Sequence, residues 1–286
     1  MTLKQKSTVG LVRGGVRYDN ILKSLEIVHD SVVERLSRSM RIVIKPDFFL
    51  EKAGMCTSAD SVTAVLDFVL DYTNKKVTIA EGLYSGSEIQ PVFHKTGLHE
   101  LADDYGLRYV DLNRDEFITV SLGNDPFSVA KGSKLSVRVA KTVISSDFRI
   151  SLAVPKLAGT VFYGASASMA IGSVISSGPS AAKNDKARLL SSKRYSADVV
   201  ELLKLIHPHL SVVDGFESAV GKRAVGTNFC TASADCIASD VTSAVALGNA
   251  LNRKIRSQKY LEQCSKAGIG QSSLSRIVVA GEKSFR

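Results

Sequence analysis

Strand-like and helix-like segments alternate through the first half of the chain. Residues 18–37 place apolar side chains at the helical period, and residues 58–72 present a second apolar helical face. Short apolar runs typical of buried strands lie at 9–13, 41–49, 76–80 and 107–112. This alternation predicts an α/β fold, with a mainly parallel central sheet, helices on both faces and three layers.

The second half of the chain carries fewer strand–helix repeats. Residues 116–122 and 136–140 predict an added small meander or hairpin, and residues 148–154 predict a central strand. We expect a helix at 163–176, followed by a long loop rich in Ser, Gly and Lys at 176–194. The other expected elements are helices at 92–105 (broken at Gly97), 198–206, 234–251 and 257–267, and strands at 209–215 and 275–281. The chain, 1–286, is interpreted as a single α/β domain.

Composition excludes several classes of protein. Hydrophobic residues make up 44% and charged residues 23% of the chain, close to the averages for ordered globular proteins. No apolar run approaches the ~18 residues of a membrane helix, and the first residues do not form a secretory signal, so we expect a cytoplasmic protein without a membrane partner. The four cysteines form no CxxC pair, which predicts buried free thiols and no iron–sulfur cluster bound by this chain.

The formal net charge of +9 raises the question of nucleic acid binding. The basic residues are scattered, the chain has no tryptophan, and no recognised nucleic-acid motif is present. A solvated basic surface is therefore the preferred interpretation, and a nucleic-acid partner is not expected.

Charged residues follow several of the predicted strands. In parallel α/β folds, ligands bind beyond the carboxyl ends of the strands. The strand-end residues are Lys45, Asp47, Glu81, Asp111, Lys156 and Asp214. Two lysines and several carboxylates at one edge of the sheet predict a site for a small anionic ligand.

Lys156 is the strongest of these candidates. Gly159 and Thr160 follow it and precede the expected helix, so backbone N–H groups and the helix dipole would favour an anion there. The alternative is a soluble residue at the end of a buried strand, and the same alternative holds for Lys45. Glu81 is either a ribose or metal ligand or a loop cap, and Asp214 is either a ligand or an ordinary strand-to-turn residue.

Two further regions contribute candidate residues. Asp235 is expected to cap the helix at 234–251, whereas Asp240, one turn further on, gains less from capping and is a candidate functional carboxylate. The loop at 176–194 contains Lys186 and Arg188, and it is either a mobile lid over an anionic ligand or a solvated surface loop.

Taken in order, six segments resemble the domain of unknown function 362 family. They are "IVIKPDF" (42–48), "TSADSVTAVLDFVLDYTNKKVTIAEG" (57–82), "FHKTGLHELADDYGLRYVDLNRDEF" (93–117), "SSDFRISLAVPKL" (145–157), "HPHLSVVDG" (207–215) and "ADCIASDVTSAVA" (234–246). In the family, the strand-end lysine is usually followed by a Lys-Thr-His turn, whereas this chain has Ala158-Gly159-Thr160. The ferredoxin-like cysteine clusters of many relatives are also absent from this sequence.

The resemblance implies matching positions and a redox setting, but no particular reaction. The matching positions are Lys45, Glu81, Lys156, Asp214 and Asp240. The leading hypothesis is an enzyme-like binder of a small anionic metabolite, with Lys156, Asp214 and Asp240 as catalytic candidates. Mg²⁺, if used, would take oxygen ligands from Glu81, Asp214 and Asp240. The alternative, suggested by the missing histidine, is a catalytically degenerate binding or assembly partner of an iron–sulfur or redox complex.

Overall fold

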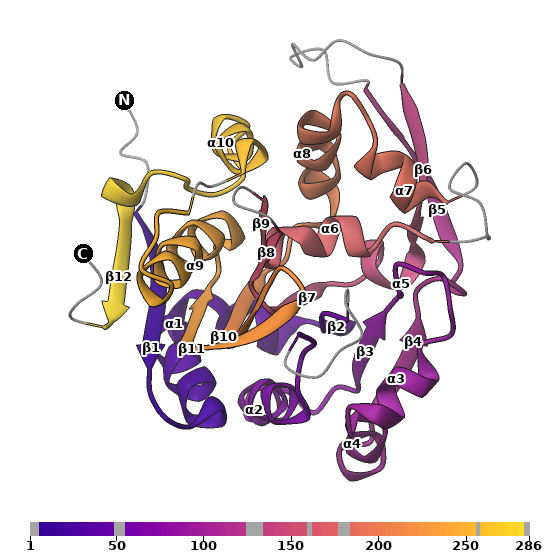
Figure 1. The fold of residues 1–286 in the computed structure, drawn as a ribbon. Coiled ribbons are helices and arrows are strands. Elements are labelled where there is room, and N and C mark those ends of the chain that lie inside the picture. Colours follow the sequence, from indigo (N-terminus) through magenta and orange to yellow (C-terminus); the bar gives the residue numbers. More distant parts are fainter. Residues whose placement is uncertain are drawn as a thin grey trace.

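A computed structural model describes residues 6–48, 55–123, 134–158, 162–176, 184–255 and 258–282 (Figure 1). One ten-stranded sheet runs through the molecule, with the strand order β12-β1-β11-β10-β7-β2-β3-β4 and with β8 and β9 attached beside β10. Most neighbouring strands are parallel and helices surround the sheet, which confirms the predicted α/β fold.

Five parallel strands form the half of the sheet that carries the candidate site. They are β10 (Leu210–Val220), β7 (Phe148–Ala153), β2 (Ile42–Lys45), β3 (Val77–Glu81) and β4 (Arg108–Asp111). Ile44 of β2 pairs with Ile79 of β3 on one side and with Ile150 of β7 on the other. Every residue of β2 and β7 is buried, as expected for central parallel strands covered on both faces.

The other half of the sheet joins the two ends of the described chain. β1 (Ser7–Arg13) lies between β12 (Ile277–Gly281), to which it is parallel, and β11 (Arg223–Ser233), to which it is antiparallel. The sequence analysis did not predict β11. The first half of this strand is largely exposed, and the polar residues Arg223 and Asn228 interrupt its apolar pattern. Gly221, at φ +61°, makes the tight turn that joins β10 to β11.

Helices pack on both faces of the sheet (Figure 1). One face is covered by α1 (Arg17–Arg38), α2 (Ala59–Leu70), α3 (Gln90–Lys95) and α4 (Leu98–Tyr105). The other face carries α9 (Cys236–Ala250), α8 (Tyr195–Ile206), α6 (Met169–Gly172) and α10 (Lys259–Lys266). Successive side chains of β2 point to opposite faces of the sheet, so the strand contributes to the apolar core on each face. Ile42 and Ile44 belong to one apolar cluster and Val43 to the other.

Several predicted helices are confirmed, and so are the predicted cap at Asp235 and the break at Gly97. The Ser58 hydroxyl accepts the backbone N–H of Ser61 at the start of α2, and Asp235 accepts N–H groups of Ile237 and Ala238 at the start of α9. Gly97, at φ +74°, separates α3 from α4 at the expected break. None of the helices in the described part of the chain is both long and apolar enough to cross a bilayer.

The prediction of one helix over 163–176 is wrong. This segment forms β9 (Phe162–Gly164), a single 3-10 turn η1 (Ser166–Ser168) and the four-residue helix α6. β8 (Lys156–Ala158) precedes it, pairing in parallel with the far end of β10 and antiparallel with β9. A run of Ala, Ser and Gly has little apolar periodicity of its own, so these tertiary strand pairings decide its structure.

The remaining short elements lie at one side of the molecule. β5 (Phe117–Leu122) and β6 (Leu135–Ala140) form the expected small antiparallel pair, and α5 (Lys141–Ile144) follows it. Within the expected loop, residues 185–190 form the helix α7 (Asp185–Leu190). Residues 177–183 lie outside the described part of the chain, so the mobility of 176–194 stays a prediction.

Candidate functional site

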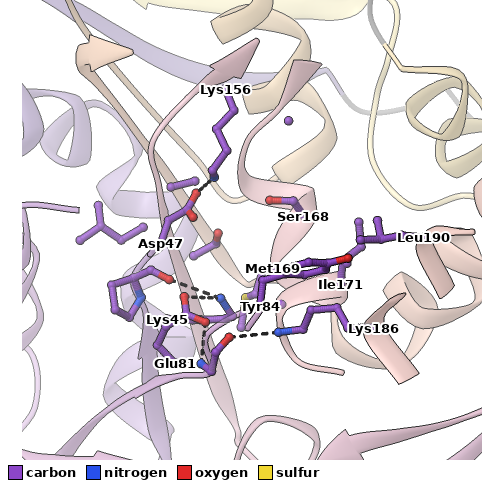
Figure 2. A pocket seen from close by; sticks show the side chains of 17 residues that line it. Lys45, Asp47, Glu81, Tyr84, Lys156, Ser168, Met169, Ile171, Lys186 and Leu190 are labelled. Atoms are coloured by element: carbon purple, nitrogen blue, oxygen red, sulfur yellow. Dashed lines mark hydrogen bonds and ion pairs between the residues drawn. The ribbon is translucent and has the colours of Figure 1, made fainter. Parts of the chain in front are cut away.

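A cavity of about 210 Å³ lies beyond the carboxyl ends of β2, β3 and β7. Three lysines line it, Lys45, Lys156 and Lys186, together with the carboxylates of Asp47 and Glu81. We call this space the lysine cavity. Figure 2 shows Lys156 and Asp47 at one end of it, and Lys45, Glu81 and Lys186 gathered at the other.

Lys45 and Glu81 are joined because their strands are neighbours. They are the last residues of β2 and β3, and Lys45 Nζ lies 2.7 Å from Glu81 Oε2. Lys45 also donates to the Pro46 carbonyl at 3.3 Å, and the other Glu81 oxygen accepts the Gly82 N–H at 2.7 Å. A Cβ atom at Gly172 would lie 2.5 Å from Lys45 Nζ, so a glycine at the end of α6 leaves room for the lysine.

Lys156 reaches the cavity from the first position of β8. Its ammonium group forms an ion pair with Asp47 and donates to the Val154 carbonyl at 3.4 Å. Burial is the main cause that lowers the pKa of Lys156, to about 7, and the positive charge of Lys45 acts in the same direction. Asp240 opposes this shift. A lysine poised near neutral pH can both hold an anion and exchange a proton.

Asp47 is held in place by the chain around it. Its backbone N–H donates to the Thr57 hydroxyl at 2.8 Å, and that hydroxyl donates to the Leu152 carbonyl at 3.0 Å. The segment after β2 is thereby tied to the end of β7, next to Lys156. Two segments that are 109 residues apart in the sequence thus meet in one ion pair.

Lys186 enters the cavity from α7 and is 3% exposed. Its Nζ donates to the Gly82 carbonyl at 3.0 Å, and it makes no salt bridge within the described residues. Burial lowers the pKa of Lys186 to about 8, against the opposing charges of Glu81 and Asp111. An ammonium group has three N–H donors, so Lys186 retains donors for a ligand.

The rest of the cavity wall is largely apolar. Leu152 and Ala153 come from β7, Met169 and Ile171 from α6, and Leu190 from α7. With the lysines protonated and both carboxylates ionised, the described lining residues bring three positive charges and two negative charges to the cavity. The cavity therefore suits an anion that also has an apolar part.

Asp214 does not line the lysine cavity, although it directly follows Val213, which pairs with the last residue of β7. β10 continues to Val220, so Asp214 falls within the strand, before a bulge between Gly215 and Glu217. It accepts from the Ser61 hydroxyl at 2.6 Å and lies 3.3 Å from Arg17 Nε, and burial raises the pKa of its carboxyl group. Among the described residues that line the lysine cavity, Asp214 is not included.

Asp240 stands behind the cavity wall and does not line it within the described residues. Its two oxygens accept the backbone N–H groups of Ser166 at 2.8 Å and Ala167 at 3.0 Å, which fixes η1 just before Met169. Burial raises the pKa of Asp240 to about 7, although these two N–H groups and Lys156 favour the ionised form. Asp240 is thus placed to position the wall of the cavity.

The remaining candidates lie elsewhere. Arg188 points away from the cavity, with Nη1 at 3.1 Å from Asp185 and 3.3 Å from the Ser136 carbonyl. Gly159 and Thr160 fall outside the described residues, so the predicted backbone anion site is not described. The sequence analysis placed Asp47 at a strand end without linking it to Lys156, and it missed the role of Gly172.

The four cysteines are free thiols, as predicted; Cys230, Cys236 and Cys264 are buried and Cys56 is half-buried. Among the described residues, no group of three or more His, Cys, Asp or Glu side chains could hold a metal ion. Glu81, Asp214 and Asp240 each have partners of their own, as given above. The Mg²⁺ ligand set and the iron–sulfur partner stay predictions.

The family model described as "Domain of unknown function (DUF362)" matches residues 42–245. The chain belongs to this family. The matched region includes every residue that carries charge into the lysine cavity, and it confirms the resemblance drawn from the sequence.

One solved structure with a similar chain path is the lactate racemase apoprotein from Thermoanaerobacterium thermosaccharolyticum. It is 14% identical, with a TM-score of 0.42, and the match covers 73% of this chain and 51% of that one. The chain therefore spans about half the length of that protein, and a likeness of this degree carries no argument about function. No match is found among curated proteins.

Proposed function

We propose that the protein binds a small organic carboxylate in the lysine cavity, as an enzyme-like binder of an anionic metabolite. One observation carries the proposal: among the described residues, three lysines and two carboxylates line a cavity at the carboxyl ends of β2, β3 and β7. Ligand sites of parallel α/β proteins lie at this edge of the sheet. The charge excess and the position of the cavity support the same class of ligand.

The ligand combines one anionic group with a short apolar body. Lys186 supplies the anion's main hydrogen-bond donor, because Lys45 is held by Glu81 and Lys156 by Asp47. Met169, Ile171 and Leu190 cover the apolar part. The cavity, at about 210 Å³, is smaller than the usual range for drug-sized ligands, which favours a molecule of a few heavy atoms.

Lys156 and Asp47 provide proton-transfer capacity beside the bound ligand. A lysine with a pKa of about 7 is present in both protonation states near neutral pH, which suits general acid–base chemistry. Asp240 acts through η1 and is a positioning residue, and Asp214 supports the sheet.

The test is calorimetric titration with acetate, propionate and butyrate, with inorganic phosphate as a comparison anion. The wild type is compared with Lys186→Met, which removes the charge but keeps an unbranched side chain of similar length. Arg188→Met is the matched control on the same helix, since Arg188 faces Asp185 instead of the cavity. We expect a carboxylate to bind the wild type and the control equally, and Lys186→Met to bind at least tenfold more weakly.

Circular dichroism and thermal unfolding establish that each variant is folded. Equal carboxylate affinity in Lys186→Met and the wild type would refute the proposal, as would the absence of any carboxylate binding to the wild type.

A further inference from the structure

A second pocket lies at the opposite edge of the sheet, before the amino-terminal ends of β2 and β7. It has a volume of about 550 Å³ and lies between the last turns of α1 and the segment that leads into β7. Among the described residues, three arginines line it, Arg35, Arg38 and Arg149, together with the carboxylates of Glu34 and Asp147. We call it the arginine pocket, and it shares no lining residue with the lysine cavity among the described residues.

Arg149 forms the buried part of this pocket and is 6% exposed. Its Nε donates to the His207 carbonyl at 3.0 Å, and Nη1 donates to the Ser146 carbonyl at 2.9 Å. Within the described residues it makes no salt bridge with a carboxylate. Burial lowers the pKa of Arg149 to about 10, and Arg35 acts in the same direction while Asp147 opposes it. A buried guanidinium without a paired counter-charge is costly, so the fold favours an anion beside it.

The donors of Arg149 are only partly used. Both ring nitrogens of His209 contact Arg149. Nδ1 lies 3.0 Å from the Arg149 backbone nitrogen, and Nε2 lies 3.0 Å from Nη2. Burial and Arg149 together lower the pKa of His209 to about 3, so the ring is neutral at pH 7. A neutral imidazole has one acceptor nitrogen, so at most one of these contacts is a hydrogen bond. At most three of the five guanidinium N–H groups therefore have an acceptor in the described structure.

The charges around Arg149 are also unbalanced. Arg38 pairs with Glu34 at 3.0 Å, and Arg41, just outside the pocket, pairs with Asp147 at 2.8 Å. Within the described residues, the one hydrogen bond of the Arg35 side chain goes to the backbone carbonyl of Asp147, at 3.4 Å. Among the described residues that line the pocket, three guanidinium groups thus face the two carboxylates of Glu34 and Asp147, which leaves an excess of one positive charge.

We propose that the arginine pocket binds the phosphate group of a phosphate monoester, with Arg149 at its base and Arg35 and Arg38 at its rim. A phosphate monoester carries about −1.5 to −2 charges at pH 7, so the excess of positive charge in the pocket attracts it. Guanidinium groups bind phosphate oxygens through two parallel hydrogen bonds, and Arg149 retains donors for this purpose. The proposal is independent of the ligand of the lysine cavity.

A simpler role for two of these residues is to complement the carbonyl end of α1, where basic side chains are favourable. That role accounts for Arg35 and Arg38, which lie in the last turns of the helix. It does not account for Arg149, which lies in β7, lines the same pocket and makes no salt bridge within the described residues.

The experiment titrates inorganic phosphate, and separately glycerol phosphate, into the protein at constant ionic strength. The test variant is the double substitution Arg35→Gln with Arg38→Gln, which leaves the buried Arg149 in place. Arg108→Gln is the matched control, because Arg108 is an exposed arginine at the amino-terminal end of β4 in the same sheet. Lys186→Met removes a main donor of the other cavity, so phosphate binding that survives in it belongs to the arginine pocket.

We expect both phosphates to bind the wild type, Arg108→Gln and Lys186→Met with equal affinity. The double variant should bind at least tenfold more weakly while unfolding at a similar temperature. The proposal is overturned if the double variant binds phosphate as tightly as the wild type. It is equally overturned if Arg108→Gln weakens binding as much, if only Lys186→Met weakens it, or if neither phosphate binds the wild type.

Discussion

Lys45 and Glu81 form a salt bridge of 2.7 Å between the ends of two parallel strands, with side chains only 7% and 5% exposed. Residues of α6 and α7 line the cavity beside the ends of β2 and β3 and help to bury both side chains. The pair therefore fixes the charged end of the lysine cavity. It also makes both residues interdependent, because each one alone would be a buried charge.

Glu81→Gln should lower the free energy of unfolding by about 3–5 kcal/mol, because it leaves Lys45 buried without its counter-charge. Urea unfolding measures the loss. The double variant Lys45→Met with Glu81→Leu should recover most of it, since an apolar pair replaces the ion pair. Glu88→Gln is the control: its contact with Arg114 is exposed, and its removal should cost at most about 1 kcal/mol. A single variant as stable as the wild type would contradict this account.

Gly172→Ala should weaken carboxylate binding by displacing Lys45. The added methyl group would lie 2.5 Å from Lys45 Nζ, and Glu81 and the Pro46 carbonyl hold that nitrogen from the other side. We expect an affinity loss of about tenfold, or about 1.4 kcal/mol, by calorimetric titration. Gly226→Ala, where no atom lies within 4 Å of the added carbon, should bind like the wild type. Unchanged affinity in Gly172→Ala would mean that Lys45 does not contribute to binding.

Carboxylate affinity should fall as the pH rises from about 6.5 to about 9. The pKa of Lys156 is lowered to about 7 and that of Lys186 to about 8, so both lysines lose their positive charge over this range. Asp240, with its pKa raised to about 7, gains negative charge over the lower part of it. All three changes make the electrostatic environment of the cavity less favourable for a bound anion. Calorimetry at several pH values measures the trend, and Lys186→Met should flatten its upper part.

The lowered pKa of Lys186 also makes the free energy of unfolding depend on pH. Because the pKa of Lys186 lies lower in the folded chain than in the unfolded chain, the unfolded state binds more protons between about pH 8 and pH 10.5. The contribution of Lys186 to the free energy of unfolding therefore rises with pH in this window. Subtracting the urea-unfolding profile of Lys186→Met from that of the wild type isolates it, and a difference that falls with pH would contradict the assignment.

Asp240→Asn should destabilise the protein by about 1–3 kcal/mol, because one of the two N–H groups at Ser166 and Ala167 loses its acceptor in the interior. Carboxylate affinity should also fall, since η1 leads into the cavity wall at Met169. Thermal unfolding and titration measure the two effects. Asp103→Asn, at an exposed position of α4, should change neither. A loss of affinity without any loss of stability would instead indicate direct ligand contact.

The sequence predicted the parallel half of the sheet well because its strands and helices carry strong periodic patterns. α1, α2 and α9 were expected within a few residues of their observed bounds. β11 and the β8–β9 pair escaped prediction because they depend on pairing with distant strands. Short polar segments of this kind have no strong local preference for the β conformation, so their sequence alone does not identify them as strands.

The candidate site was only partly predictable for a related reason. Lys45, Glu81 and Lys156 follow from the rule that strand ends share an edge of the sheet. Asp214 was predicted to follow the end of its strand, whereas β10 continues past it to Val220 because β11 pairs with the extension. The pairing of Lys156 with Asp47 and the entry of Lys186 from α7 are tertiary relationships, which spacing along the chain does not contain.

The position of β1 has a consequence for how the chain is made. Ser7 pairs with Ile277, and Gly10 pairs with Ala232, so both neighbours of β1 are translated more than two hundred residues after it. Synthesis proceeds at about 5–20 residues per second. Both hydrogen-bonding edges of β1 therefore stay unpaired for about 10–45 seconds before β11 has been synthesised. The strand that is synthesised first is thus among the last to gain its hydrogen-bonding partners. The nascent chain should then depend on factors that shield exposed strand edges, a requirement that ribosome-profiling of chaperone contacts can measure.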